Sequence, residues 1–220
     1  MTPRGDVDAG ALKRLSGEIV SVSRTFHARG WALATSGNFS ARVGSGVVVI
    51  TASGFDKGEL TEEGLLCIDL DGSSLLPPEP RGARPSAETP LHVGLYRRFP
   101  TAGAVLHVHA PAATTLSAMT GGGGAVRLQR WEMLKALAGV ATHDHEEIIP
   151  VIDNDQDTER LAARAAERLS ALPDAHAYLV AGHGLTTWGR SVGEARRHVE
   201  ALEHLFDCEL RRATAEGGPR

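Results

Sequence analysis

Two histidines separated by one residue stand in an apolar stretch of the chain, "VLHVH" at residues 105–109. A β-strand projects alternate side chains to the same face, so His107 and His109 would place their imidazoles in one small volume. Three interpretations fit this pair: a metal site, a catalytic pair, or two histidines that form hydrogen bonds within the core. The pair alone leaves all three open.

A third histidine, His183, stands between two glycines in the sequence "GHG". Because glycine has no side chain, the backbone around His183 can approach a neighbouring group closely. A catalytic zinc site uses three protein ligands and one open position for water or substrate, and neutral imidazole is a favoured ligand. His107, His109 and His183 together therefore favour the metal interpretation.

Acid-base chemistry beside a metal usually needs a carboxylate whose pKa is tuned by its surroundings. Glu88 and Glu132 both stand at predicted helix starts and outside runs of charge. Each is a candidate catalytic residue, and each would also suit a helix N-terminus through the helix dipole alone. His92 follows Glu88 by one helical turn and lies either near the site or on the helix surface.

The remaining histidine pairs have simpler interpretations. His198 and His204 stand among Glu200 and Glu203 near the C-terminus, a pattern typical of the charged outer face of a helix. The pair in residues 143–145 lies in an acidic segment and predicts a solvated turn. Neither pair is expected to form a site.

Three loops could bind an anion through hydroxyls and glycine-exposed backbone N–H groups. They are "TSGNFS" at 35–40, "TASG" at 51–54 and "RPS" at 84–86. One such loop is weak evidence, because loops of this composition are common. Three in one chain favour a phosphate ligand.

Composition restricts the class of protein and its partners. The 220 residues suit a single domain with a sizeable core, and the 42% hydrophobic and 23% charged residues are ordinary values for a globular protein. The 23 basic residues are dispersed and outnumbered by 27 acidic ones, which excludes a typical nucleic-acid partner. The two cysteines, Cys67 and Cys208, form no CxxC motif and are expected to be free thiols in a reducing cytoplasm. No stretch predicts a signal peptide or a membrane span.

Helical and strand patterns alternate along the chain, which predicts an α/β sheet covered by helices. We expect one domain over residues 1–220, with frayed tails at 1–7 and 212–220. The expected helices cover 8–29, 86–99, 111–119, 131–139, 157–172 and 195–206. The expected strands cover 47–53, 65–72, 102–109, 146–152 and a pair within 175–189.

The order and spacing of "TSGNFS", "TASG", "PSAE", "HVH" and "GHG" resemble the class II aldolase family of zinc-dependent sugar-phosphate aldolases, epimerases and dehydratases. The resemblance covers roughly residues 10 to 210. Within the family, five segments are similar to those of the bacterial dehydratases of methionine salvage, and "EMLKALAG" is the most discriminating part. These segments are "PSAETPLH", "VLHVHAPA", "WEMLKALAG", "IPVIDNDQD" and "GHGLTTWG".

The resemblance implies a three-layer α/β/α sandwich with a mixed, mostly antiparallel central sheet. It also implies one Zn²⁺ per subunit, bound by His107, His109 and His183. Members are commonly homotetramers whose active sites lie at subunit interfaces, so a neighbouring subunit would complete each site.

The implied reaction is the dehydration of 5-methylthioribulose 1-phosphate to 5-methylthio-2,3-dioxopentyl phosphate. In the family aldolases the acid-base carboxylate belongs to the "PSSE"-type motif, which corresponds to Glu88 here. In the dehydratases the glutamate of "EM" is implicated, which corresponds to Glu132. For a dehydration we therefore predict proton transfer by Glu132 and a supporting, metal-proximal role for Glu88.

The resemblance also supplies candidates for binding the rest of the substrate. Trp131 or Met133 could contact the methylthio group, and Ala87 replaces the second serine of the aldolase motif, so one phosphate contact is missing or replaced. The candidate phosphate-binding residues are Thr35, Gly37, Asn38, Ser53, Gly54 and Ser86, with Lys57 or Lys135 for charge.

Two alternatives remain from the sequence. A sugar-phosphate aldolase or 4-epimerase would use the same zinc chemistry on a carbon–carbon bond. A non-catalytic, zinc-stabilised binding protein is the alternative of a different class. Structural zinc sites usually have four protein ligands, whereas the sequence offers three clear ones, which disfavours the second alternative.

Overall fold

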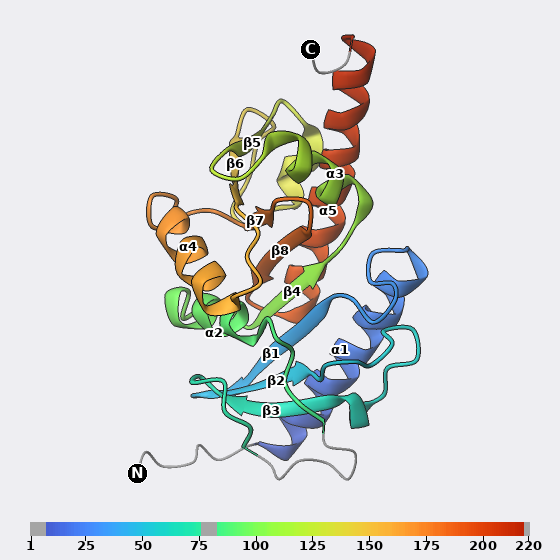
Figure 1. Ribbon diagram of the computed structural model, residues 1–220, viewed down its shortest axis with the longest axis vertical. Coiled ribbons are helices and arrows are strands. Elements are labelled where there is room, and N and C mark those ends of the chain that lie inside the picture. Colours follow the sequence, from blue (N-terminus) through green and yellow to red (C-terminus); the bar gives the residue numbers. More distant parts are fainter. Residues whose placement is uncertain (1–7, 76–82, 218–220) are drawn as a thin grey trace.

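The computed structural model describes residues 8–75 and 83–217 and contains one mixed sheet of eight strands in the order β3-β2-β1-β4-β8-β7-β6-β5 (Figure 1). Every neighbouring pair is antiparallel except β6 and β7, which are parallel. Helices cover both faces of the sheet. The predicted three-layer sandwich with a mixed, mostly antiparallel sheet is confirmed.

The α-helices are α1 (Ala9–Ala28), α2 (Thr89–Arg98), α3 (Pro111–Thr120), α4 (Thr158–Ser170) and α5 (Val192–Ala215), and the 3-10 helices are η1 (Glu62–Gly64) and η2 (Glu132–Ala136). The strands are β1 (Asn38–Gly44), β2 (Val47–Thr51), β3 (Leu65–Asp69), β4 (Ala104–Val108), β5 (Ala125–Gln129), β6 (Glu146–Ile152), β7 (Ala177–Val180) and β8 (Gly184–Gly189).

Alternation along the strands divides the apolar core between the two faces. In β2, Val47 and Val49 pack with α1, α3 and α5, whereas Val48 and Ile50 pack with α2 and α4. The sheet is therefore buried on both sides, and a polar side chain on either face lies beneath a helix. This matters for β4, where Val105 faces α2 and α4 and His107, two residues later, shares that face.

The register of β4 places its histidine in the middle of the sheet. His107 pairs with Asn38 of β1 on one side and with Thr186 of β8 on the other. Three polar side chains thus meet on the face covered by α2.

Most expected elements are present, and the differences are local. The expectation contained no strand over β1 or β5, and residues 131–139 contain a short 3-10 helix, η2, rather than an α-helix. α5 continues to Ala215, through part of the expected frayed tail, while residues 1–7 and 218–220 lie outside the described residues. In the part of the chain that is described, no helix is both long and apolar enough to cross a membrane.

Candidate metal centre and active site

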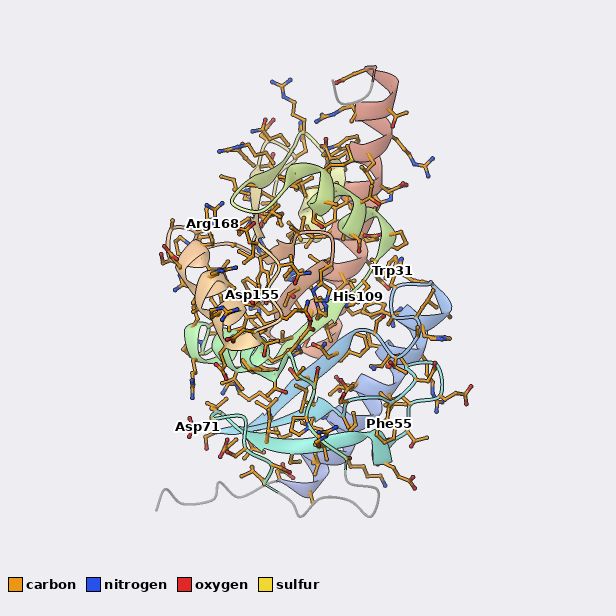
Figure 2. The ribbon with its side chains drawn as sticks, viewed as in Figure 1. Trp31, Phe55, Asp71, His109, Asp155 and Arg168 are labelled. Carbon is orange, nitrogen blue, oxygen red and sulfur yellow. The ribbon has the colours of Figure 1, made fainter. Side chains whose placement is uncertain are left out.

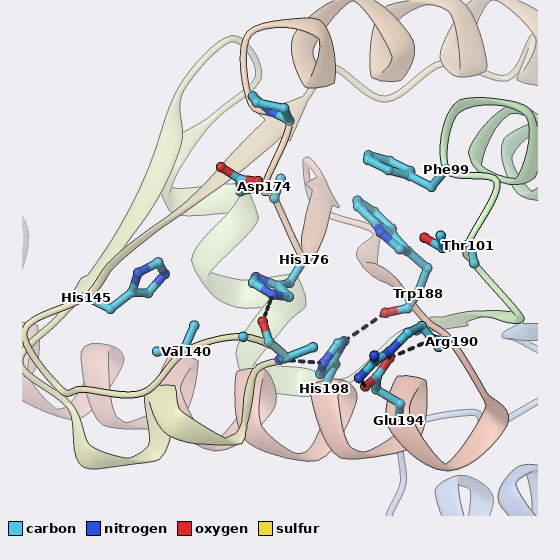
Figure 3. A pocket seen from close by; sticks show the side chains of 16 residues that line it. Phe99, Thr101, Val140, His145, Asp174, His176, Trp188, Arg190, Glu194 and His198 are labelled. Atoms are coloured by element: carbon cyan, nitrogen blue, oxygen red, sulfur yellow. Dashed lines mark hydrogen bonds and ion pairs between the residues drawn. The ribbon is translucent and has the colours of Figure 1, made fainter.

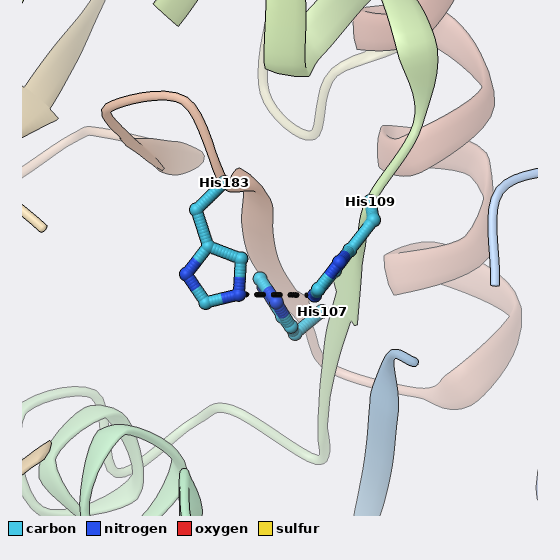
Figure 4. Close-up of side chains that lie close together, drawn as sticks. All are labelled: His107, His109 and His183. Atoms are coloured by element: carbon cyan, nitrogen blue, oxygen red, sulfur yellow. Dashed lines mark hydrogen bonds between the residues drawn. The ribbon is translucent and has the colours of Figure 1, made fainter. Parts of the chain in front are cut away.

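The three histidines expected to bind metal come together at one end of β4, where Figure 2 labels His109. His107 lies in β4, His109 follows the strand immediately, and His183 lies in the turn between β7 and β8. One nitrogen from each ring lies within 4.8 Å of the others, and the Nε2 atoms of His109 and His183 are 3.0 Å apart (Figure 4).

Glycine allows the β7–β8 turn to carry His183 so close to β4. Gly182 has φ +63°, a backbone conformation that residues other than glycine rarely adopt. At Gly184 a Cβ atom would lie 2.2 Å from the carbonyl oxygen of Val108, so a larger residue would push β8 away from β4. The two glycines of "GHG" thus allow the histidine between them to lie close to β4.

The hydrogen bonds of His107 leave one ring nitrogen for a ligand. Its Nδ1 lies 3.1 Å from the carbonyl oxygen of Leu185 and 3.0 Å from Oγ1 of Thr186. The carbonyl can only accept, so Nδ1 carries a proton, and in the neutral ring Nε2 then has a lone pair available for a ligand. This Nε2 is buried and has no hydrogen-bond partner. A metal-binding histidine characteristically donates its other N–H to a carbonyl in this way.

Glu88, at the start of α2, adds a carboxylate to the three histidines. Its Oε1 lies 3.2 Å from Nε2 of His183, and its Oε2 lies 3.4 Å from Nε2 of His107. The edges of a tetrahedron of donors about 2.0–2.1 Å from a metal are about 3.3–3.4 Å long. The separations of 3.0, 3.2 and 3.4 Å among these donors fit a bound divalent cation.

The charge states of these groups favour cation binding. Burial, reinforced by the charges of His107 and His183, lowers the pKa of His109 to about 3. Burial, followed by the charge of His107, also lowers the pKa of His183. Burial opposes ionisation of Glu88, but the charge of His107 and a hydrogen bond from Asn38 bring its pKa to about 2. Neutral imidazoles beside a carboxylate are the form in which these residues bind metal.

A cavity of about 650 Å³ adjoins the cluster, with Glu88, His109 and His183 in its wall. The other polar residues that line this cavity were not predicted as site residues. A signal was present in the polar run "DNDQD", which follows directly on the buried strand β6. The additional polar lining residues are Thr114, Thr115, Asn154, Asp155, Gln156 and Thr158.

The three candidate anion loops converge beside the histidines. Ala52 and Pro85 form an isolated β-bridge, and the backbone N–H of Ser53 donates to the carbonyl oxygen of Arg84 at 2.9 Å. These contacts join the "TASG" and "RPS" loops. The "TSGN" loop meets them through Asn38, whose amide donates to Glu88 at 2.6 Å.

Several candidate phosphate-binding residues have structural contacts of their own. Asn38 is bonded to Glu88 and to His92, and Ser86 accepts a hydrogen bond at 3.3 Å from the backbone N–H of Glu88. Gly37 has φ +75°, and a Cβ atom there would lie 3.1 Å from the carbonyl oxygen of His107. Three candidates have exposed loop positions, namely Thr35, Ser53 and Gly54.

The two candidate lysines lie in different surroundings. Lys57 is buried, and its Nζ donates to the carbonyl oxygens of Thr35 and Phe55, each at 2.9 Å. Burial lowers the pKa of Lys57 to about 8, against the opposing charge of Asp56. Lys57 therefore anchors the "TSGN" loop. Lys135 lies in η2 and pairs with Glu132.

Glu132 lies outside the histidine cluster within a single chain. It begins η2, its side chain is 72% exposed, and it is not among the residues that line the 650 Å³ cavity. The neighbouring Met133 is also exposed, and Trp131 donates from Nε1 to Glu209 of α5 at 2.7 Å. Within one chain, the structure thus brings Glu88, but not Glu132, to the histidines.

A second cavity, of about 450 Å³, lies beside β8 and α5 (Figure 3). His176 donates from Nε2 to the carbonyl oxygen of Ala138 at 2.8 Å, and the N–H of Ala138 donates to Nε2 of His198 at 3.1 Å. His198 in turn donates from Nδ1 to the carbonyl of Trp188 at 2.8 Å. These two imidazoles hold the backbone that follows η2.

The sequence predicts that His198, Glu200, Glu203 and His204 lie on the outer face of a helix. This prediction is wrong for two of the four. His198 is 2% exposed, and Glu203 is 6% exposed. The carboxylate of Glu203 accepts from the N–H groups of Ala112 and Ala113 at 2.8 and 3.0 Å, which caps the N-terminus of α3. Both residues are buried because each has backbone partners on another segment.

A family model described as Class II Aldolase and Adducin N-terminal domain matches residues 17–210. Two curated proteins named methylthioribulose-1-phosphate dehydratase are among the similar sequences. The protein from Methylococcus capsulatus is 52% identical over 88% of this chain and 92% of its own length. The protein from Sorangium cellulosum is 45% identical over 99% of both chains.

Solved structures with the same fold include relatives of lower identity. L-fuculose-1-phosphate aldolase from Thermus thermophilus is 30% identical, with a TM-score of 0.71 over 94% of this chain and 100% of that chain. YgbL from Escherichia coli is 28% identical, with a TM-score of 0.75 over 90% of this chain and 88% of that chain.

Proposed function

The chain belongs to the class II aldolase and adducin family, and from this membership we propose that it is a lyase that dehydrates 5-methylthioribulose 1-phosphate. The products are 5-methylthio-2,3-dioxopentyl phosphate and water, a step of methionine salvage. The observation that carries the proposal is the cluster of three imidazoles and one carboxylate that adjoins a substrate-sized cavity, with Glu88, His109 and His183 in the cavity wall. The names and identities of the curated relatives favour dehydration among the reactions of the family.

His107, His109 and His183 would hold one Zn²⁺ per chain. The orphaned Nε2 of His107 and the donor separations of 3.0–3.4 Å support this assignment. Zinc bound there would supply a Lewis acid that polarises the carbonyl of the substrate. Glu88 is ionised and faces two of the imidazoles, which supports its metal-proximal role.

The loops around Thr35, Ser53 and Ser86 would bind the phosphate group of the substrate. Their convergence beside Glu88 supports this placement. Exposed hydroxyls and backbone N–H groups donate to phosphate oxygens without a compulsory positive charge. The amide of Asn38 is committed to Glu88, and Lys57 holds the loop at Thr35, so we assign both a role in shaping this subsite.

Glu132 would remove the C3 proton of the substrate and return it to the departing C4 hydroxyl. In one chain Glu132 lies on an exposed 3-10 helix, so the site would be completed when η2 of a neighbouring subunit reaches the cavity. The neighbouring Met133 is likewise exposed in one chain. A homotetramer with interfacial active sites satisfies this requirement.

The direct test is mass spectrometry of the products formed from 5-methylthioribulose 1-phosphate by the zinc-loaded protein in the presence of a dicarbonyl trap. The expected product has lost one water and is captured as a diketone. Conversion of other sugar phosphates with cleavage or epimerisation, and none of this substrate, would favour the aldolase or 4-epimerase alternative. A protein that binds zinc, unfolds without it and converts no sugar phosphate would favour the non-catalytic alternative.

A further inference from the structure

Two sets of polar side chains interdigitate between the sheet and the helix that carries Glu88. Glu88, His92 and Tyr96 follow one another at intervals of four residues, so they share one face of α2 and of its first turn. Asn38 and Ser40 are two residues apart in β1 and share the face that α2 covers. The five residues form what we call the α2–β1 ladder.

The side chains of the ladder alternate between the two elements in one continuous series of hydrogen bonds. Asn38 Nδ2 lies 2.6 Å from Glu88 Oε2, and Asn38 Oδ1 lies 2.5 Å from His92 Nε2. Ser40 Oγ lies 2.7 Å from His92 Nδ1 and 2.9 Å from the hydroxyl of Tyr96. His92, Ser40 and Tyr96 are each at most 1% exposed, so solvent does not compete for these bonds.

The ionised carboxylate at one end sets the direction of every hydrogen bond in the ladder. Glu88 can only accept, so it selects the amide orientation in which Asn38 donates from Nδ2 and accepts at Oδ1. His92 must then donate from Nε2, which leaves Nδ1 of the neutral ring to accept from Ser40. Ser40 Oγ accepts in turn from Tyr96. Every donor therefore points toward Glu88, and bonds aligned in this way strengthen one another.

A polar cluster that served only to stabilise the core would have no reason to end on a functional carboxylate. Here the ladder begins at the group that lies 3.2 and 3.4 Å from two of the three clustered imidazoles. Removing the donor at His92 Nε2 would leave Asn38 Oδ1 buried without a partner. The amide would then be held only by its bond to Glu88 and would no longer be fixed from both ends.

We propose that His92 is a positioning residue, which holds the amide of Asn38 so that the carboxylate of Glu88 is fixed against the metal-binding histidines. Ser40 and Tyr96 extend the same function by holding the ring of His92. For turnover the proposal rests on the proposed function, whereas its effect on the affinity for Zn²⁺ does not.

Two substitutions of similar size and polarity separate positioning from packing. His92→Gln places an amide donor near the position of Nε2 and retains the bond to Asn38. His92→Asn places its amide near the position of Nδ1 and loses that bond. Ser40→Ala tests the next step of the ladder. Thr187→Val removes a buried hydroxyl of β8, which donates to the carbonyl of His176 at 2.6 Å outside the ladder, and serves as control.

The affinity for Zn²⁺ is measured by competition with a chromogenic chelator, and kcat and KM are measured with the sugar phosphate. Loss of a group that orients a metal ligand typically costs about 10–100-fold in metal affinity or activity. We expect His92→Asn to lose about 10–100-fold in both Zn²⁺ affinity and kcat relative to the wild type, with KM changed less than about threefold. His92→Gln should stay within about threefold of the wild type, Ser40→Ala should lie between them, and Thr187→Val should lower only the stability.

Equal values for His92→Asn and His92→Gln, or a loss that follows the fall in unfolding midpoint across all four variants, would overturn the proposal. If the wild-type protein does not dehydrate the sugar phosphate, the proposed function fails on its own. The order of the Zn²⁺ affinities then still decides the role of His92. Variants that fold poorly are replaced in the series by Tyr96→Phe, which keeps the ring and removes only the far donor.

Discussion

Glu88 Oε1 lies 3.2 Å from Nε2 of His183, although Glu88 is the N-cap residue of α2 and His183 occupies the turn between β7 and β8. The carboxylate reaches this position because α2 lies over the face of the sheet onto which His107 also projects. A carboxylate in this place adds a fourth donor to the three imidazoles. Glu88 also forms part of the cavity wall. The two glutamates singled out by the sequence are thus in different surroundings, and the same substitution at each should have different effects.

Glu88→Gln should lower the affinity for Zn²⁺, because the amide keeps the shape of the side chain and loses the charge that faces the cation. The expected loss is about 10–100-fold, together with a loss of turnover. Glu132→Gln should leave the affinity for Zn²⁺ unchanged, since Glu132 lies outside the histidine cluster in its own chain. Metal content by mass spectrometry and chelator competition measure both. Equal affinities for the two variants would contradict the metal-proximal position of Glu88.

Mixed oligomers should reveal whether Glu132 acts across a subunit interface. Glu132→Gln should lose about 10²–10⁴-fold in turnover, as expected for an acid-base residue, and His109→Ala should be inactive through loss of a metal ligand. After the two variants are unfolded together and refolded, a site can combine His109 of one chain with Glu132 of another. Random mixing in a symmetric oligomer should restore about a quarter of the wild-type activity. No recovery in oligomers shown to be mixed would place Glu132 in the site of its own chain.

The part of the site that could be predicted rests on local signals. Alternation along a strand placed His107 and His109 on one side of β4, and the glycines flanking His183 indicated a close approach of backbone. Glu88 was identified through its motif. The strand β1 was missed although Phe39, Ala41 and Val43 alternate with polar residues, because its first residues were interpreted only as part of the "TSGNFS" loop.

The rest depends on contacts between distant segments. His198 and Glu203 read as surface residues because their charged neighbours in the sequence suggest an exposed helix face. Their partners are backbone N–H groups of Ala138 and Ala112, which reach them only once the sheet and α5 have packed. The bonds from Asn38 to Glu88 and His92 likewise depend on how α2 crosses β1. No pattern within a short window contains this information.

Alanine substitutions at two glycines should change the free energy of unfolding in opposite directions: Gly184→Ala should lower it, and Gly17→Ala should raise it. At Gly184 the new Cβ atom would meet the carbonyl oxygen of Val108 at 2.2 Å, and the strand must shift, which should cost about 1–3 kcal/mol and weaken metal binding at His183. Gly17 lies exposed within α1 with no atom near the added Cβ, so alanine should stabilise the helix by about 0.5–1 kcal/mol. Urea unfolding measures both. A Gly184→Ala variant as stable as the wild type would show that β8 can move without cost.

The pair of Glu147 and His176, beside the second cavity, should make stability depend on pH. Burial opposes both charges, but the hydrogen bond and charge within the pair lower the pKa of Glu147 and raise the pKa of His176. The carboxylate contribution is present above the unfolded pKa near 4.5 and is lost as pH falls through the lowered pKa. The imidazolium contribution is present below the unfolded pKa near 6.5 and is lost as pH rises through the raised pKa.

The difference in unfolding free energy between the wild type and Glu147→Gln should therefore be largest between pH 4.5 and 6.5 and should decline on both sides. Urea unfolding of the two proteins across this range measures it, and contributions from the other histidines cancel where they are common to both. Glu63→Gln, at an exposed position of η1, is the control and should show no such maximum. A difference that stays constant with pH would contradict an ion pair between Glu147 and His176.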